Sequence, residues 1–347
     1  MRRIFASLAL LLLLLPTTYL RTANPPPPDR SQQINVTPVA IDPASPGLRE
    51  IGGLTFLKGW ALKSANTDFG GFSAMVALPD KRFLLLSDAG VLAGFTLDER
   101  HSRALTPFIA PLPDGPPRTF DASTGQLRRK NWDAESFLHD PVTGKYFAGF
   151  EHGEQIWRYD ASFARADGVA KPTAMRDWLR NGGAEAMFRM RDGRFIVIAE
   201  DHPWAGTVPE GLIFAGDPTL FKQKVEKFSY VAPDGYFLTD ATLLPDGRAL
   251  LLHRQFSLLT GLRAIVSIAD PAEIRAGQRW KSRPIARLAP PLLVDNMEGI
   301  AVTTEAGEPI VWLTSDDNFS SMQRTLLLKF RLNDKAGPQP GLSSLDR

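Results

Sequence analysis

The chain has 347 residues, of which 44% are hydrophobic and 22% charged, a composition typical of a globular protein large enough for one or two domains. The formal net charge is only +2, so the basic surface that a nucleic-acid-binding protein needs is not expected and nucleic acid is excluded as a partner. The sequence contains no cysteine, which excludes disulfides, thiolate metal sites and cysteine nucleophiles.

The N-terminus has the pattern of a targeting segment. Arg2 and Arg3 are followed by an almost unbroken apolar run over residues 4–15. The run extends only to about Leu20, which is short for a membrane span of roughly 20 residues. We predict a signal peptide over residues 1–23. An uncleaved membrane anchor stays open as the alternative, because Arg21 suits a cleavage site after Ala23 poorly. Either form predicts a folded part that is periplasmic or secreted, in contact with a membrane only through such an anchor.

Residues 24–47 are rich in proline and polar side chains and are expected to form a linker without a core. Two short apolar runs follow in residues 48–62 and predict two strands that lack the rest of a sheet. The folded domain is expected over residues 48–335, with a C-terminal tail over residues 336–347.

One hairpin pattern recurs five times, and each copy has two apolar runs joined by a tight turn. The clearest copy turns at Asp192-Gly193. The copies start about 50 to 60 residues apart, and one or two further strand-like runs follow each of them. The copies span residues 70–90, 131–153, 181–201, 236–255 and 295–318.

About four strands per repeat predict an all-β fold, a β-propeller of four-stranded blades. Five blades are counted, and a sixth is possible because the segment 100–130 is long. A β-sandwich is the competing architecture, but five copies of one hairpin at near-constant spacing disfavour it. The strands expected in residues 48–62 would pair beside residues 325–332 and close the ring, which hides the edge strands.

The five hairpins align two columns of polar residues. About seven residues before the turn stand Ser73, Glu135, Glu185, Thr239 (or Asp240) and Glu298. About eight residues after the turn stand Asp88, Glu151, Glu200, Arg254 and Ser315 or Asp316. A hairpin brings its two open ends together, so both columns are expected around one mouth of the central channel.

Several carboxylates in one small space repel one another and need a cation, bound protons or paired bases. Carboxylate and carbonyl oxygens suit Ca²⁺. We therefore expect a calcium site, and the alternative is a set of solvated acids that pair with arginines. The expected metal ligands are Asp88, Glu135, Glu185, Glu200, Glu298 and Asp316. The expected substrate contacts are Arg254, His253, His152 and Arg324.

Several motifs resemble those of the phytase-like family, described as "esterase-like activity of phytase". They occur in order over about residues 48–335. The resemblance implies an exported bacterial β-propeller with a loosely defined hydrolase activity. The motifs are Phe69–Ser73, Phe83 with Ser87-Asp88 and Gly90, Asp133–Ser136, Gly182–Met187, Asn296–Ala301 and Leu313–Phe319.

Two functions of different classes remain. The first is a hydrolase of phosphate or carboxylic esters, in which Ca²⁺-bound water is the nucleophile. Glu185 and Glu298 would then act as base or ligand, and Arg254 would contact the oxyanion or phosphate. The second is a non-catalytic envelope propeller that binds a ligand or partner and holds a structural calcium. Both predict a monomer, and the hydrolase predicts a small-molecule substrate.

Overall fold

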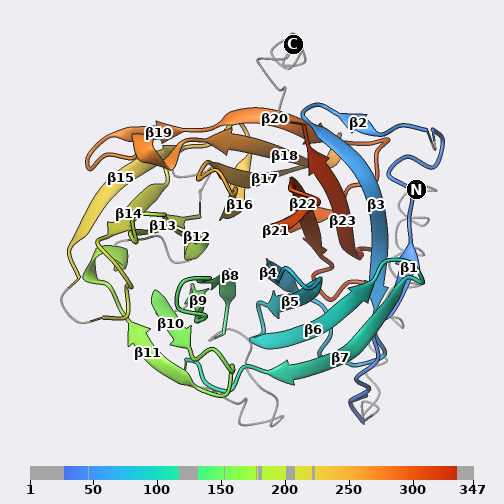
Figure 1. Ribbon diagram of the computed structural model, residues 1–347, viewed down its shortest axis with the longest axis horizontal. Coiled ribbons are helices and arrows are strands. Elements are labelled where there is room, and N and C mark those ends of the chain that lie inside the picture. The colour runs from blue at the N-terminus through green and yellow to red at the C-terminus, as the bar shows by residue number, and fades with distance from the viewer. Residues whose placement is uncertain are drawn as a thin grey trace, which may run out of the picture.

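The computed structural model describes residues 27–45, 47–116, 132–151, 153–176, 178, 182–200, 208–220 and 223–333. Five sheets surround a central axis (Figure 1). The predicted five-bladed β-propeller is therefore confirmed, and the described ranges contain no sixth sheet. Two single-turn 3₁₀ helices, Thr173–Met175 and Pro271–Glu273, are the only helices among these residues. No helix within these ranges is both long and apolar enough to span a membrane.

Each blade begins at the channel with an inner strand and continues outward in antiparallel pairs. Blade one contains β4 (Phe72–Ala77), β5 (Arg82–Ser87), β6 (Val91–Asp98) and β7 (Arg103–Pro111). Blade two contains β8 (Ala134–His139), β9 (Tyr146–Phe150), β10 (Gln155–Tyr159) and β11 (Ala166–Ala170). Blade three contains β12 (Ala184–Arg189), β13 (Phe195–Ala199), β14 (Glu210–Phe214), β15 (Val225–Val231) and a parallel outer strand, β19 (Arg279–Lys281).

The last two blades are built from the second half of the chain and its N-terminal strands. Blade four contains β16 (Phe237–Leu243), β17 (Ala249–Ser257), β18 (Gly261–Ala269) and β20 (Arg283–Leu288). Blade five contains β21 (Asn296–Glu305), β22 (Glu308–Asp316), β23 (Thr325–Leu332), β3 (Leu54–Lys63) and β1 (Asn35–Pro38), with β2 (Glu50–Ile51) on β3.

The ring closes between the two ends of the folded chain, as predicted. β3 pairs antiparallel with β23 from Thr325↔Leu62 to Leu332↔Leu54. The buried rings of Trp60 and Trp312 stack across this sheet, with centroids 6.3 Å apart. Closure covers the free edge that β23 would otherwise present to solvent.

The predicted linker over residues 24–47 is wrong in its second half. β1 adds to the outer edge of β3, with Asn35 opposite Lys63 and Pro38 opposite Trp60. Ile34 and Ile41 flank this strand and are buried. An otherwise polar stretch is therefore held by a strand pairing and by two apolar anchors.

Apolar side chains of neighbouring blades pack against one another and hold the inner strands in place. Phe83 of blade one meets Trp312 of blade five edge to face at 4.7 Å. Phe147 of blade two meets Phe195 of blade three at 5.0 Å. These contacts between sheets stabilise the ring that brings polar residues of different blades together.

Candidate functional site

Each inner strand has a β-bulge near its start, at the same position in all five blades. The ladder skips one residue in each strand, and these residues are Ser73, Glu135, Glu185, Thr239 and Glu298. A bulge leaves its extra residue unpaired and redirects the side chain. The first predicted column is thus a series of bulge residues, and Thr239 rather than Asp240 occupies it in blade four.

The second column follows from the register of the inner hairpins. The residue before each bulge pairs with Ser87, Phe150, Ala199, His253 or Ser315. The residue that follows this partner on the second strand therefore lies beside the bulge, at the same end of every blade. These residues are Asp88, Glu151, Glu200, Arg254 and Asp316, which selects Asp316 over Ser315.

Among the residues that the structure describes, the tightest group of acids lies in blade two. Asp133, Glu135 and Glu151 each place a carboxylate oxygen within 4.8 Å of the others. The backbone N–H of Glu151 donates to the carbonyl of Asp133 at 2.8 Å, which fixes the two chain segments side by side. Glu151 is buried, and its Oε1 has no hydrogen-bond donor. Three carboxylates, one of which has an unsatisfied buried oxygen, fit a divalent cation such as Ca²⁺.

Asp133 is missing from the ligands expected from the sequence. It lies two residues before Glu135, within the motif Asp133–Ser136. Neighbours at this spacing in a strand share a face, so the spacing was a usable signal. The bulge at Glu135 and the return of the chain at Glu151 decide that all three carboxylates converge.

Burial perturbs the carboxylates of this mouth. It raises the pKa of Glu151 to about 8, and the negative charge of Asp133 adds to the effect. Burial raises the pKa of Glu135 well above its usual value, with Asp133 and Glu298 contributing next. Burial likewise raises the pKa of Glu185, and the charge of Glu135 adds to it. The acids therefore favour protons or a cation over free negative charge.

The fifth blade adds two further perturbed acids. Burial raises the pKa of Glu298 to about 7, although the positive charge of Arg254 opposes the shift. Burial raises the pKa of Asp316 to about 7, and the charge of Asp88 contributes to this. Asp88 thus lies close enough to Asp316 to affect its ionisation. Asn296 donates from Nδ2 to Oε1 of Glu298 at 2.7 Å and orients that carboxylate.

Arg254 is the single cation of the two columns. Its Nε lies 3.1 Å from Oε1 of Glu298, and its Nη2 lies 4.0 Å from Oε1 of Glu200. Its Nη1 approaches Oδ1 of Asn296 at 3.4 Å. The guanidinium therefore connects blades three, four and five, and one third of the side chain (33%) remains exposed to a ligand. We call this end of the channel the acidic mouth, formed by Arg254 with Asp88, Asp133, Glu135, Glu151, Glu185, Glu200, Glu298 and Asp316.

One of the predicted substrate contacts, His253, lies elsewhere than expected. His253 is fully buried, and its Nε2 lies 2.6 Å from the hydroxyl of Tyr230 in blade three. Burial lowers the pKa of His253 to about 3. Alternate residues of a strand point to opposite faces, so Arg254 reaches the mouth and His253 enters the packing between blades. The prediction for His253 is therefore corrected.

Arg324 lies at the same end of blade five, half exposed, and its Nε is 3.4 Å from Oδ2 of Asp295. Asp295 precedes Asn296, so this pair lies at the edge of the acidic mouth. His152 lies outside the described residues.

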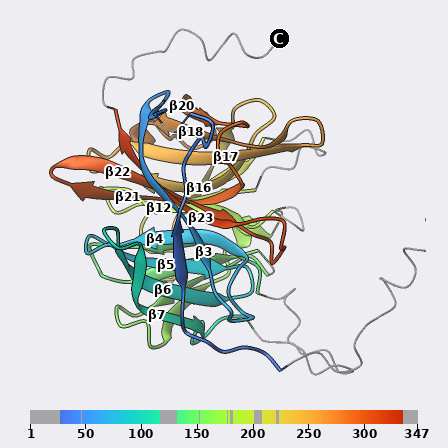
Figure 2. The same cartoon turned by 90° about the vertical axis from the view of Figure 1, so that its right-hand side faces the viewer.

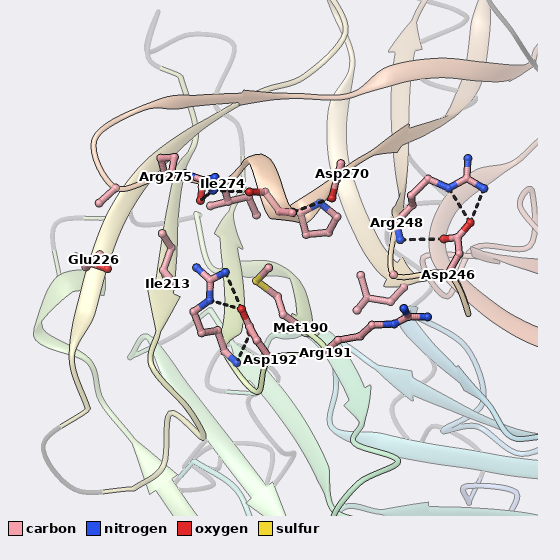
Figure 3. A pocket seen from close by; sticks show the side chains of 16 residues that line it. Met190, Arg191, Asp192, Ile213, Glu226, Asp246, Arg248, Asp270, Ile274 and Arg275 are labelled. Carbon is pink, nitrogen blue, oxygen red and sulfur yellow. Dashed lines mark hydrogen bonds and ion pairs between the residues drawn. The ribbon is translucent and has the colours of Figure 1, made fainter.

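Two cavities lie away from the acidic mouth. A cavity of about 640 Å³ is lined by the turn ends of the inner strands, among them Met75, Met187 and Leu243. A cavity of about 800 Å³ lies between the turns of blades three and four (Figure 3). In this second cavity the Nε atoms of Arg194 and Arg248 donate to Asp192 and Asp246 at 2.8 and 2.7 Å. These two arginines are therefore paired with acids of the same cavity, and no predicted site residue lines either cavity.

The chain is similar to several solved structures and to one family model. The endo-arabinase from Bacteroides thetaiotaomicron superposes with a TM-score of 0.48 at 11% identity, covering 76% of this chain and 94% of that one. The α-L-arabinofuranosidase from Podospora anserina, solved in complex with cellotriose, has a TM-score of 0.48 at 10% identity, covering 87% and 97%. A comparison with curated proteins returns no match. The model of the phytase-like family, "Esterase-like activity of phytase", matches residues 67–319. With this match over most of the propeller, the chain belongs to the phytase-like family.

Proposed function

We propose that this propeller is an exported hydrolase of phosphate or carboxylic esters that depends on Ca²⁺ and acts at the acidic mouth. The observation behind the proposal is the convergence of Asp133, Glu135 and Glu151 within 4.8 Å, together with the unsatisfied buried oxygen of Glu151. Acids that serve only as solvated turn residues would be exposed and separately paired. Here they converge from two neighbouring segments of blade two, with Glu151 buried and Asp133 and Glu135 partly buried.

Asp133, Glu135 and Glu151 would hold the cation. Glu185, Glu200 and Glu298 lie close enough to interact electrostatically with Glu135 or Glu151, and Asp88 and Asp316 belong to the same mouth. A calcium ion supplies a polarised water and a positive charge for the oxyanion that develops on the substrate. The chain's own contribution is a set of oxygens fixed by the bulges and by backbone hydrogen bonds. Their mutual repulsion is relieved when a cation binds.

Glu185 and Glu298 are the candidates for the general base. Both are buried bulge residues that project from inner strands at the acidic mouth. The pKa of Glu298 is raised to about 7, close to the value at which a base works best near neutral pH. Arg254 beside it would contact an anionic oxygen of the substrate.

The charges at the mouth favour substrates with little negative charge. Among the described residues of this rim, the arginines are Arg254 and Arg324, and each already has an acidic partner. Recognition of a densely phosphorylated molecule usually needs several arginines or lysines. A carboxylic ester, or an ester with a single phosphate, is therefore the substrate class that we propose.

Turnover of p-nitrophenyl acetate and p-nitrophenyl phosphate, measured with Ca²⁺ and with a chelator, tests the proposal. We expect turnover that the chelator abolishes and that Glu185→Gln and Glu298→Gln reduce by about 100-fold or more. Asp192→Asn is the matched control, because Asp192 lies at the opposite end of the hairpin that contains Glu185. Full activity in both glutamine variants would contradict the site.

The second candidate is a non-catalytic propeller with a structural calcium. Arg254 favours it, because its guanidinium connects three blades and so has a structural use. Stabilisation by Ca²⁺ without turnover of either ester would support this candidate over the hydrolase.

A further inference from the structure

An exposed apolar hairpin projects from the acidic mouth. The exposed fractions are 61% for Phe256, 92% for Leu258 and 95% for Leu259, all at the tip between β17 and β18. Met322, in the loop between β22 and β23 of the neighbouring blade, is 90% exposed. The three apolar side chains of the hairpin lie within four residues of one another, and such a group of exposed apolar side chains indicates a contact surface.

The hairpin extends past the mouth in the direction of the channel axis. The β17–β18 ladder continues beyond Arg254 to the pair Ser257↔Gly261. Three residues of strand correspond to about 10 Å, so the tip stands beyond the carboxylates. Figure 2 shows this hairpin and the β22–β23 loop on one side of the propeller, opposite the β21–β22 turn. The segment from residue 255 to 269 contains Arg263 and no acid.

The N-terminal end of the described chain lies on the same side. The carbonyl of Asp29 accepts from the backbone N–H of Thr67 at 3.1 Å, and Asn66 donates to the carbonyl of Ser31 at 2.8 Å. Residues 66 and 67 belong to the connection that enters β4 at the mouth. The described chain therefore begins on the side of the propeller that also carries the exposed hairpin, although at a different edge (Figure 2). The sequence before this point contains the apolar run of residues 4–20 and the prolines of residues 25–28.

We propose that the rim formed by Phe256, Leu258, Leu259 and Met322 is a membrane-contact surface, which docks the acidic mouth against a lipid bilayer. In the form of the protein that keeps residues 1–23 as an anchor, a tether that leaves the domain on this side keeps the rim at a high local concentration near the membrane. The apolar side chains enter the boundary between headgroups and acyl chains, where Arg263 meets anionic headgroups. The mouth then opens toward molecules at the membrane surface. This inference concerns orientation and does not depend on hydrolysis.

Because the chain has no cysteine, one introduced thiol can be labelled cleanly. We would place an environment-sensitive fluorophore at Thr260→Cys on the hairpin tip, in the full chain reconstituted into vesicles. The matched control is Val142→Cys, which is 70% exposed on the turn at the opposite end of blade two. The vesicles contain phosphatidylcholine with phosphatidylglycerol, or phosphatidylcholine alone, and a nitroxide-labelled lipid as quencher.

We expect emission from the Thr260 label to shift to the blue and to be quenched several-fold more than emission from the Val142 label. The double substitution Leu258→Ser with Leu259→Ser should remove most of this difference. Equal quenching at both labels would overturn the proposal, as would quenching that the double substitution leaves unchanged. A blue shift that appears without vesicles and grows with protein concentration would assign the rim to a second copy of the chain instead.

Discussion

The guanidinium of Arg254 lies 3.1 Å from the carboxylate of Glu298, across the boundary between blades four and five. This pair places the one cation of the two columns directly beside a candidate base. Glu298 raises the pKa of Arg254, and Arg254 in turn opposes the rise in the pKa of Glu298. The charge of each residue therefore affects the ionisation of the other.

Replacing Arg254 should impair the hydrolase in two separable ways. Arg254→Gln should lower kcat/KM for anionic esters by about 100-fold, because a positioned donor to a developing oxyanion is lost. It should also move the acid limb of the pH–rate profile to higher pH, because the pKa of Glu298 rises above about 7 when the cation is absent. Initial rates measured across the pH range check both effects.

Two further variants serve as controls for Arg254. Arg254→Lys should recover the position of the acid limb but only part of the rate, because an ammonium retains the charge and loses the planar fork. Arg248→Gln should change neither, since Arg248 pairs with Asp246 on a turn at the opposite end of blade four. If the acid limb of the pH–rate profile stays in place in Arg254→Gln, Glu298 is not the general base.

Calcium should stabilise the protein, and more so as the pH rises. The pKa of Glu151 is raised to about 8 in the folded protein, against about 4.5 in the unfolded chain. Without metal, the contribution of Glu151 to the stability of the fold is therefore fully present only below about pH 4.5. This contribution is lost as the pH rises to about 8. At that pH the carboxylate is ionised, so binding of a cation stabilises the protein most. At 100-fold excess over its Kd, Ca²⁺ should add about 2.7 kcal/mol to the free energy of unfolding.

Thermal unfolding with Ca²⁺ and with chelator, at pH 5 and pH 8, measures this effect. Glu135→Gln and Glu151→Gln should lose most of the calcium shift, whereas Asp246→Asn on a distant turn should retain it. A calcium shift of equal size in all of these variants would place the ion elsewhere.

The buried imidazole of His253 should make the fold sensitive to mild acid. Its pKa is lowered to about 3 in the folded protein, against about 6.5 when unfolded, so between these values the unfolded chain binds more protons. Stability is therefore lost as the pH falls below about 6.5, by about 1.4 kcal/mol per pH unit. The acids of the mouth lose stability as the pH rises, which is the opposite trend. The contribution of His253 is therefore measured as the difference in unfolding free energy between the wild type and a variant of His253.

Urea unfolding of the wild type and of His253→Gln at several pH values provides that difference. The variant should be less stable at pH 7, where the contact with Tyr230 is lost, and the gap should narrow by roughly 2 kcal/mol at pH 5. A gap that does not depend on pH would show that His253 is already charged or accessible to water.

Asp240 ties blade four to blade five. Its Oδ2 accepts from the backbone N–H of Ile300 at 2.8 Å and its Oδ1 from that of Ala241 at 2.7 Å, with the side chain fully buried. Asp240→Ala leaves both donors without a partner and should cost about 2 to 4 kcal/mol of unfolding free energy. Denaturant unfolding checks this, with Asp246→Ala on an exposed turn as the control. Equal losses of unfolding free energy in the two variants would contradict a stabilising role for these hydrogen bonds of Asp240.

The sequence was sufficient for the architecture because propeller blades repeat a local unit. An apolar run, a tight turn and a second apolar run predict a hairpin wherever they occur, and five copies predict five blades. The pairing of residues 48–62 beside residues 325–332 followed from the need to cover an open edge. The two polar columns followed from counting residues outward from each turn.

Only the tertiary structure decided which polar residues meet. The bulge in β16 explains why Thr239 occupies the first column, since one extra residue changes the direction of a side chain. The register of β21 and β22 selects Asp316 for the second column. Asp133 joins Glu135 and Glu151 only after β8 and β9 have paired, and Arg254 reaches Glu298 only after two blades have packed together. His253 and Arg254 are neighbours in sequence but point to opposite faces of β17. Turn chemistry and periodicity are local and can be recognised in the chain, whereas the meeting of charges from different blades depends on ring closure and packing between sheets.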